Sequence, residues 1–479
     1  MSNSPNQMSV NLDSCVAELR QQFPAAAVMT GDDIPQRNLQ DTSYLPAVRP
    51  LAVVRPDSPE GVAEAMRICT AHGVAVVPQG GLTGLAGGGH PVEGAVMISL
   101  ERFSGIEELD ADAATITVRA GTPLEVIQRA ADEAGFFIAL DLGARGSCQI
   151  GGNLSTNAGG NRVIRYGMAK EMVLGLEYVL PDGTLVTGLN KMLKNNAGYD
   201  LKQLFLGSEG TLGIITRAVL RLHPRPGCTH AALCGVESYE DVVRLLGAAR
   251  RGLGPMLSAF EVMWPDYWHA ATVTVKGIRA PIEGAHGFYV LVEMQGLDEV
   301  VDGDRFMAWI EQAFEDGIIA DAAVSQSMAD VASFWRTRDA AAEFGTVLGP
   351  HCAFDIGLPV RSMDAFADAC RARLAAEIPN SLSVYYGHIG DGNLHIVALS
   401  MGAPVQPGTA ISDIVYATVR EFGGTISAEH GIGLLKKPYL HYTRTRQELA
   451  LMRRLKRALD PGNLLNPGKV VDLVESESQ

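Results

Sequence analysis

The stretch PQGGLTGLAGGGHP, residues 78–91, follows the short apolar run GVAVVPQ and is the most informative segment for the fold. A glycine-rich loop directly after a predicted strand lets backbone N–H groups approach a phosphate closely, because no Cβ is in the way. The strict GxGxxG dinucleotide pattern is absent, and these glycines do not begin a helix. The loop therefore predicts a phosphate-bearing ligand in a fold other than an ordinary nicotinamide-dinucleotide domain.

A second glycine-dense segment, GSCQIGGNLSTNAGGNRVIRYG at 146–167, mixes glycine with small hydroxyl and amide residues. Such a segment can bond ribityl hydroxyls, pyrophosphate oxygens and the edge of a flavin ring. The alternative is a set of tight turns in a β-rich region. We favour the ligand-binding interpretation, because two such clusters are separated by predicted strands.

The surrounding sequence predicts two regions that each contain both strands and helices. From Leu51 onward short apolar runs alternate with amphipathic segments, such as the helix predicted to start at Ser58-Pro59 and to stop at Gly73. After the proline-rich segment at 223–226 the glycine clusters stop, and longer strand–helix alternation continues to about residue 420. The end of the glycine clusters and the longer strand–helix alternation predict a second α+β domain.

Composition and charge exclude several classes of partner. The chain has 479 residues, with 39 Lys and Arg against 54 Asp and Glu, a formal net charge of −15. This balance argues against nucleic acid and against an anionic membrane surface. Seven cysteines without a CxxC pair predict free thiols in a reducing compartment. With neither a recognisable signal peptide nor a long apolar run, we expect a cytoplasmic protein without a membrane span.

Two later segments carry residues suited to metal binding. The segment YYGHIGDGNLHIVAL contains His388 and His395, and the segment ISAEHGIGLLKK contains Glu429 and His430. Two histidines and one carboxylate are a common ligand set for Zn²⁺ or another divalent ion that keeps positions open for substrate. The alternative is a pair of structural histidines. The joint presence of HxGDGNxH and AEHG favours the metal interpretation. Apolar alternation around His395 predicts a strand.

These motifs, with NAGYDLKQLFLGSEGTLGIIT and LDPGNLLNPGK, resemble the vanillyl-alcohol-oxidase-type FAD flavoproteins over about residues 45–475. Within that superfamily the resemblance is to the D-2-hydroxyglutarate dehydrogenase, D-lactate dehydrogenase and glycolate-oxidase FAD-subunit group. It implies an α+β fold: a bipartite FAD-binding domain of the p-cresol methylhydroxylase (PCMH) type with an inserted α+β substrate domain and a C-terminal helical segment. We expect an N-terminal helix and loop at 1–45, the FAD domain at 46–225, the substrate domain at 226–420, and a returning segment at 421–479.

The resemblance implies non-covalent FAD, since His90 matches an attachment position poorly. Gly80, Gly81, Thr83 and Gly84 would hold the pyrophosphate, and Glu209, Gly210, Gly213 and Ile215 would lie along the adenine and ribose. The remaining implied FAD contacts are Pro78, Leu85, Ser147, Gly151, Gly152, Asn153, Thr156, Asn157, Gly160, Arg165, Tyr166, Gly167 and Asn466.

The resemblance also implies roles in catalysis. His388, His395 and Glu429 would bind a divalent metal, most simply Zn²⁺, His430 would be the base, and Asn393 would contact the substrate carboxylate. The chemistry requires such groups, because an alcohol hydroxyl is too weak an acid to lose its proton at neutral pH unaided. A metal on the hydroxyl and carboxylate lowers that pKa, and a neutral imidazole then accepts the proton.

Substrate identity stays open. The segment FWRTRDAAAE offers Arg338 and Arg336 for a distal carboxylate, or alternatively these are solvated or ion-paired residues of a helix face. In CAFDIGLPV, Ala353 stands where the D-2-hydroxyglutarate group has a lysine. D-2-hydroxyglutarate, D-lactate and D-malate are therefore all candidates. The cations that could compensate for the missing lysine are Arg336, His351 and Arg165.

Three functional hypotheses follow. The first is a D-2-hydroxy-acid dehydrogenase that passes electrons to an electron-transfer flavoprotein or a quinone. The second is a flavin oxidase that uses O₂, and the third is a non-autonomous FAD subunit of a glycolate-oxidase-like complex. The complete set of His388, His395, Glu429 and His430 favours autonomous catalysis. The oligomeric state is open, with a homodimer as one option.

Overall fold

The chain folds into two compact units in the computed structural model, which describes residues 5–473. Unit 1 contains the chain up to Gly160, Met168–Arg225 and the chain from Glu429 onward, whereas unit 2 contains Asn161–Gly167 and Pro226–Ala428. The chain leaves unit 1 at the proline-rich segment, where the sequence predicts a boundary. It returns at Glu429 rather than at residue 421. The segment 161–167, expected in the FAD domain, belongs to unit 2.

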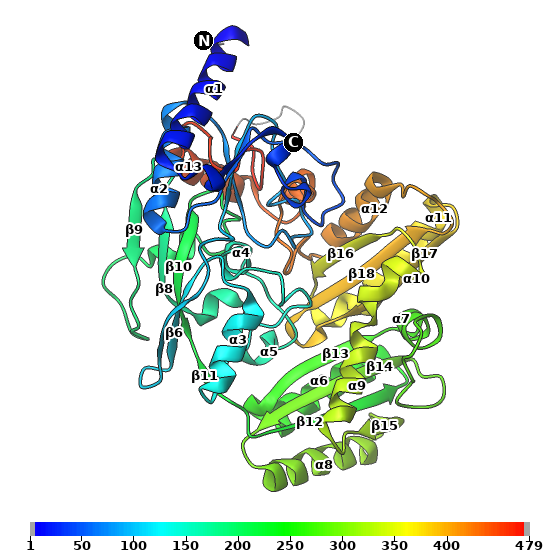
Figure 1. Cartoon of the computed structure of the whole chain (residues 1–479). Helices are drawn as coiled ribbons and strands as arrows, with labels where there is room; N and C mark the ends of the chain where they lie inside the picture. The colour runs from blue at the N-terminus through cyan, green and yellow to red at the C-terminus, as the bar shows by residue number, and fades with distance from the viewer. Residues whose placement is uncertain (1–4, 474–479) are drawn as a thin grey trace. The chain divides into compact units, whose positions relative to one another are not determined.

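A small sheet in the N-terminal part of unit 1 positions the first glycine loop (Figure 1). Its strands, in order, are β1 (Val28–Met29), β2 (Ala52–Val54), β4 (Val96–Ser99) and β3 (Val76–Gln79). The glycine loop connects β3 to β4, which pair in parallel. Helix α2 (Pro59–Ala71) begins as predicted, with the Ser58 side chain accepting the Gly61 N–H. Helix α1 (Pro5–Gln22) contacts α2.

The second sheet of unit 1 is antiparallel throughout. Its strands, in order, are β5 (Ile106–Asp110), β6 (Thr115–Arg119), β10 (Ile214–Arg221), β8 (Val173–Val179) and β9 (Leu185–Gly188). A separate two-stranded ribbon pairs β7 (Phe136–Phe137) with β11 (His223–Pro224). The helices of this region are α3 (Leu124–Glu133) and α4 (Ile150–Ser155), and α4 lies within the second glycine-dense segment.

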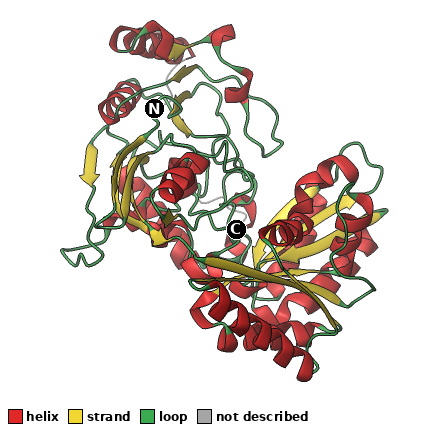
Figure 2. Cartoon of the chain, turned by 60° about the horizontal axis from the view of Figure 1, so that its bottom comes forward, coloured by secondary structure: helices red, strands yellow, loops and turns green. Residues whose placement is uncertain are grey.

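Unit 2 is built on a seven-stranded antiparallel sheet. In order its strands are β15 (Asp321–Val324), β12 (Cys228–Val236), β14 (Phe288–Gly296), β13 (Leu257–Met263), β17 (Ser381–Gly387), β18 (Asn393–Ser400) and β16 (Cys352–Gly357). Figure 2 shows helices packed along this sheet. They are α5 (Val163–Tyr166), α6 (Tyr239–Gly252), α7 (Pro265–His269), α8 (Glu299–Glu315), α9 (Met328–Arg338), α10 (Phe344–Val347), α11 (Met363–Glu377) and α12 (Gly408–Glu421).

One face of this sheet packs against α7 and α9 through a large apolar core. Leu291 of β14, Tyr267 of α7 and Phe334 of α9 all belong to this core and are at most 5% exposed. On β18, Val397 and Leu399 join the same core. His395 lies two positions before Val397 in the same strand, so its side chain points to the same face. The sheet therefore brings His395 to the face that carries the end of α9.

The C-terminal segment of unit 1 contains α13 (Arg446–Leu459), which starts with a capping box formed by Thr445 and Glu448. Lys456 of this helix is buried, and its Nζ donates to the carbonyls of Thr211 and Leu465. The bond to Thr211 fixes the C-terminal segment against the rest of unit 1. Within residues 5–473, no helix is long and apolar enough to cross a membrane.

Candidate active site

The two glycine clusters of unit 1 pack directly against one another. A Cβ at Gly81 would collide with the Ser147 carbonyl oxygen and would lie 2.9 Å from the Cα of Cys148. A Cβ at Gly80 would touch the Gln149 side chain at 3.5 Å. At Gly81 only glycine permits this approach, so the loop after β3 packs its backbone directly against the segment before α4.

This surface contains buried polar atoms that lack partners. The Oε1 of Gln149 and the Oδ1 of Asn153 are buried and accept no hydrogen bond from any described residue. Burying an unpaired acceptor costs free energy, so such atoms indicate a missing donor. The hydroxyls of a flavin ribityl chain or of a ribose are donors of the required kind. The residues present therefore fit FAD, and Gln149 is a candidate contact that the sequence reasoning did not assign.

Left-handed backbone recurs in the predicted cofactor segments. Leu82, Asn157, Glu209 and Asn466 have φ values of 60°, 50°, 53° and 46°. Non-glycine residues adopt this region at a cost of about 1–3 kcal/mol, and they concentrate at functional sites. The four residues come from four separate segments of unit 1, all expected from sequence to approach the cofactor.

Glu209 and Asn466 tie the C-terminal segment to the glycine loop. The Glu209 carboxylate accepts the backbone N–H groups of Ile432 at 2.6 Å and Gly433 at 2.8 Å. Asn466 Nδ2 donates to the carbonyls of Gly88, at 3.1 Å, and Glu209, at 2.8 Å. Burial raises the pKa of Glu209 despite these bonds. Both side chains thus hold segments together, in addition to any contact with a cofactor.

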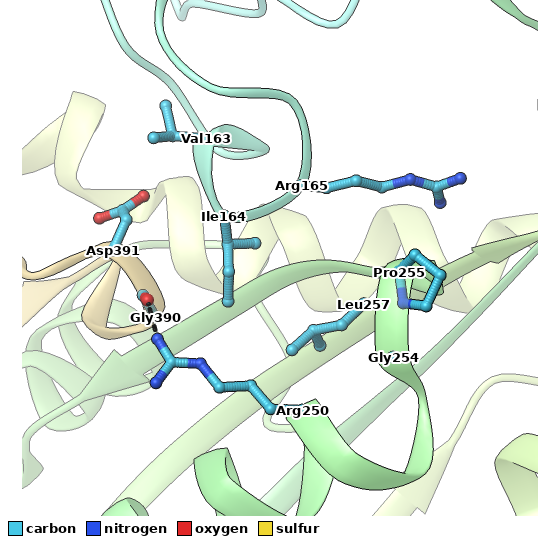
Figure 3. A pocket seen from close by; sticks show the side chains of 9 residues that line it. All are labelled: Val163, Ile164, Arg165, Arg250, Gly254, Pro255, Leu257, Gly390 and Asp391. Carbon is cyan, nitrogen blue, oxygen red and sulfur yellow. Dashed lines mark hydrogen bonds between the residues drawn. The ribbon is translucent and has the colours of Figure 1, made fainter.

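Arg165 and Tyr166, expected beside the flavin, bond to residues of unit 2. Arg165 Nη1 donates to the Gln295 carbonyl at 2.6 Å, and the Tyr166 hydroxyl donates to Gln295 Oε1 at 3.2 Å. Arg165 also lines an open cavity of about 390 Å³ together with Ile164, Leu257 and Asp391 (Figure 3). Across this cavity Arg250 Nη2 donates to the carbonyl of Gly390 at 2.7 Å.

The two predicted metal-binding histidines of unit 2 meet on one face of the sheet. His388 follows β17 and His395 lies in β18, as predicted, and their ring centroids are 5.1 Å apart. Both are at most 9% exposed. His388 Nδ1 lies 2.6 Å from Glu261 Oε1 of β13, a distance at which the ring N–H donates to the carboxylate. This bond leaves Nε2 with the lone pair that a metal requires.

Arg338 lies in this cluster, whereas Arg336 does not. Arg338, the last residue of α9, is buried; its Nε donates to Glu261 at 2.8 Å, and its Nη2 lies 3.1 Å from His388 Nε2. Burial opposes ionisation of Glu261, but its contacts with His388 and Arg338 lower its pKa to about 2. Arg336 is exposed. Of the two helix arginines, the structure therefore brings only Arg338 to the histidines.

A second carboxylate organises the neighbouring strand pair. Asp355 of β16 is fully buried and accepts a hydrogen bond from Asn393 Nδ2 at 3.0 Å. It also accepts the backbone N–H of Ala428 at 3.2 Å. The Asn393 Oδ1 is buried and has no partner among the described residues. Ala353, two residues before Asp355, is exposed on the same face of this edge strand.

Glu429 and His430 follow Ala428 directly and begin the C-terminal part of unit 1. Glu429 Oε1 accepts the backbone N–H of Gly160 at 2.6 Å, and Gly159 lies so close that a Cβ there would collide with the same carboxylate. His430 is half-buried. The carboxylate is therefore held beside the end of the second glycine cluster and is one peptide bond away from the segment that Asp355 anchors.

Sequence reasoning missed Glu261 and Asp355. Neither stands in a glycine-bounded motif, and Glu261 is 127 positions from the histidine that it contacts. The only local signal is an acidic residue at an inward position of an otherwise apolar strand: AFEVM for Glu261 and AFDIG for Asp355. Buried carboxylates of this kind are paired or orient functional groups.

Comparisons with known proteins agree with this picture. The family model for an FAD binding domain matches residues 50–188, and the model for the C-terminal domain of FAD linked oxidases matches residues 225–470. The D-2-hydroxyglutarate dehydrogenase of Xanthomonas citri pv. viticola is 39% identical over 465 residues, covering 96% of this chain and 97% of the relative. The mitochondrial D-2-hydroxyglutarate dehydrogenase of Bos taurus is 35% identical, covering 97% and 84%.

A solved structure shows the same fold. The crystal structure of p-cresol methylhydroxylase with substrate bound superimposes with a TM-score of 0.79 at 17% sequence identity, covering 98% of each chain. The fold is therefore the PCMH-type FAD-binding fold with mixed α and β content.

The glycine-built cradle and the inserted sheet domain define a flavoprotein oxidoreductase. More specifically, the chain belongs to the FAD-linked oxidase family and is an FAD-dependent dehydrogenase.

Proposed function

We propose that the protein oxidises a D-2-hydroxy acid to the 2-oxo acid, with His388, His395 and Glu429 binding a divalent cation and His430 accepting the hydroxyl proton. When bound, FAD supplies the hydride acceptor and the cation lowers the pKa of the substrate hydroxyl. The observation that carries the proposal is the buried cluster on the α9 face of unit 2, where two histidines lie beside a carboxylate and an arginine. The names of the two relatives support the same reaction class.

The donor set of unit 2 fits a divalent cation. Glu261 orients His388 through Nδ1, which is the usual arrangement behind a metal-binding histidine and raises the basicity of Nε2. Arg338 Nη2 lies 3.1 Å from His388 Nε2, so a bound metal would replace this contact. The hydrogen bond from Arg338 Nε to Glu261 would remain. Glu429 would add a carboxylate from the segment that Asp355 anchors through Ala428.

The proposed base is His430 because it directly follows the proposed carboxylate ligand. A neutral imidazole with a pKa near the working pH is suited to take a proton from an acidified hydroxyl. A cation next to it favours the neutral form of the ring, since a second positive charge close by is repelled.

Substrate orientation would come from Asn393 and Arg338. Asp355 fixes one N–H of the Asn393 amide at 3.0 Å, which leaves a second N–H and the unpartnered Oδ1 for ligand groups. The guanidinium of Arg338 is always charged and attracts an anionic substrate inside a protein of net charge −15. Ala353 adds no cation on this face, which favours an acid with a short side chain, such as D-lactate, over a five-carbon diacid.

The proposal is tested by mixing the oxidised holoenzyme anaerobically with D- and L-2-hydroxy acids and recording the flavin absorbance. The panel contains lactate, malate and 2-hydroxyglutarate. Bleaching by one or more D-acids and not by their L-enantiomers supports the reaction. Bound FAD that no member of the panel reduces would overturn it. Hydrogen peroxide formed stoichiometrically in air would instead identify a flavin oxidase.

A further inference from the structure

A second group of metal-ligating side chains lies elsewhere in unit 2, where β12 begins and α8 starts. Cys228, His230 and Glu299 each offer one ligand atom, and these atoms all lie within 4.8 Å of one another. None of the three residues takes part in the proposed reaction.

Strand geometry explains why the first two residues converge. Cys228 and His230 are two positions apart in β12, so their side chains point to the same face of the sheet. The ring of His230 packs against Phe306 of α8, with centroids 6.0 Å apart. Ala231 and Leu233 point the other way, into the core under α9. The pair therefore faces α8.

This position separates the group from the catalytic histidines. In the sheet order, β12 and β18 are four strand spacings apart, which corresponds to about 19 Å at about 4.8 Å per spacing. His395 also lies on the α9 face rather than the α8 face. An ion held by Cys228 and His230 would thus be a different ion from the one that His388 and His395 would bind.

Among the acidic residues at the start of α8, only Glu299 is available as a ligand. Asp298 is the N-cap, and its Oδ1 accepts the N–H groups of Val300 and Val301. Asp302 Oδ2 accepts the N–H groups of Leu297 and Asp298. The Glu299 side chain forms no hydrogen bond or ion pair with the residues that the structure describes.

The histidine and the cysteine also point to a missing partner. The Nε2 of His230 is buried and has no hydrogen-bond partner within residues 5–473, and Cys228 is only 5% exposed. A divalent cation would balance the carboxylates and stabilise the thiolate. Glycine at 303 leaves room, since a Cβ there would lie 3.1 Å from the imidazole.

We propose that Cys228, His230 and Glu299 form a second binding site for a thiophilic divalent cation of the Zn²⁺ class. Binding replaces the thiol proton, which passes to solvent, and no oxidation or reduction occurs. Ligand atoms about 2 Å from a tetrahedral ion lie roughly 3.5 Å apart. The exposed Glu299 side chain closes the remaining gap, and water occupies the fourth position. The ion joins the first strand of unit 2 to the N-terminal turn of α8.

Cobalt(II) distinguishes this site from the catalytic one, because only this site contains a thiolate. Chelator-treated holoenzyme is titrated with Co²⁺, and the difference spectrum is recorded for thiolate charge transfer and for tetrahedral d–d bands to the red of the flavin absorbance. Bound metal is counted in parallel by mass spectrometry. The variants are Cys228→Ser, His230→Gln and His388→Ala, with Cys352→Ser as the matched cysteine control.

We expect the thiolate signature in the wild type, in His388→Ala and in Cys352→Ser, and its loss, with one fewer ion per chain, in Cys228→Ser and His230→Gln. Added Zn²⁺ should displace Co²⁺ and abolish the thiolate absorbance. It should also raise the thermal unfolding midpoint of every variant that retains the site. A wild-type spectrum without thiolate character, or an ion count that Cys228→Ser does not change, would overturn the proposal. Failure of the catalytic metal assignment would appear separately, as an ion count that His388→Ala does not change.

Discussion

The flavin cradle of unit 1 and the histidine cluster of unit 2 are built from different kinds of chemical group. In unit 1 the cradle is mostly backbone: Gly81 packs against the Ser147 carbonyl so closely that no side chain fits between them. In unit 2 the site is made of side chains, with His388 bonded to Glu261 and Arg338 within the same buried cluster. The first arrangement is sensitive to added volume and the second to lost charge or lost ligands.

Because of this contrast, substitutions in the two units should affect cofactor binding and catalysis separately. A change in unit 2 should leave flavin content intact and remove turnover, whereas a glycine replacement in unit 1 should lower flavin affinity before it affects the histidines.

His388→Ala should abolish D-2-hydroxy-acid turnover and remove one divalent ion per chain, because it deletes a ligand that Glu261 orients. Flavin content should match the wild type. Metal analysis, flavin absorbance and steady-state rates check this result. His351→Ala is the matched control, since His351 is half-buried and its Nδ1 lies 3.0 Å from the Gly349 carbonyl oxygen. Unchanged metal content in His388→Ala would refute the ligand assignment.

His430→Ala should retain both flavin and metal and reduce the rate of flavin reduction by about 10²–10⁴-fold, the usual contribution of a general base. Stopped-flow measurement of flavin bleaching under anaerobic conditions isolates this step. Added imidazole should restore part of the rate if the missing group is a proton acceptor. Bleaching at the wild-type rate would assign the base elsewhere.

Gly81→Ala should weaken FAD binding by about 5–150-fold, because forcing a methyl group against the Ser147 carbonyl costs about 1–3 kcal/mol or displaces the loop. Gly143→Ala is the control, since a Cβ at Gly143 meets nothing within 4 Å. Equilibrium titration of apoprotein with FAD measures the effect. Equal affinities for the two variants would mean that the close packing of the glycine clusters does not shape the cradle.

Glu261→Gln should lower metal affinity by about 10–100-fold while keeping the shape of the side chain, because it removes the carboxylate that orients His388. Competition with a chromogenic chelator measures this affinity. Glu237→Gln, which changes an exposed glutamate in the same unit, is the control. If both variants bind metal as the wild type does, Glu261 does not position the ligand.

The smallest expected effect is a pH dependence of the free energy of unfolding that arises from Lys469 in unit 1. Burial lowers its pKa to about 8 from 10.5, and its Nζ donates to Asn466 Oδ1 at 3.0 Å. Between these values the unfolded chain binds more protons than the folded one, so stability should rise with pH, at most by about 1.4 kcal/mol per pH unit.

The thermal midpoint of the apoprotein, measured across this pH range, should therefore rise relative to Lys469→Met. Lys437→Met serves as the control, since Lys437 pairs with Asp472 near the surface. Parallel pH profiles for wild type and Lys469→Met would show that Lys469 does not titrate in this range.

Local sequence signals predicted the elements, whereas long-range partners emerged only from the structure. Ser58 and Pro59 specify the start of α2, and the apolar alternation around His395 specifies β18, because both depend on neighbours within a few residues. Nothing local pairs Glu261 with His388 or Asp355 with Asn393. Those contacts depend on the register of β13, β17, β18 and β16, which the whole sheet determines.

The same limit explains the segment 161–167. The segment directly follows Gly159 and Gly160, which suggests the flavin cradle, but Tyr166 and Arg165 bond to Gln295 of β14, 129 and 130 positions away. A motif defines which residues are chemically suited to a ligand. It does not determine which unit they pack with, and the division after Gly160 is visible only once both units are folded.

The most direct test of the account is to treat the holoenzyme with a chelator, remove the chelator, and mix the protein anaerobically with the D-2-hydroxy acid that bleaches the flavin best. We predict that FAD stays bound, that bleaching is lost, and that a divalent cation restores it in the wild type but not in His388→Ala. Full bleaching by the metal-free wild type would contradict the claim that unit 2 uses a metal held by His388.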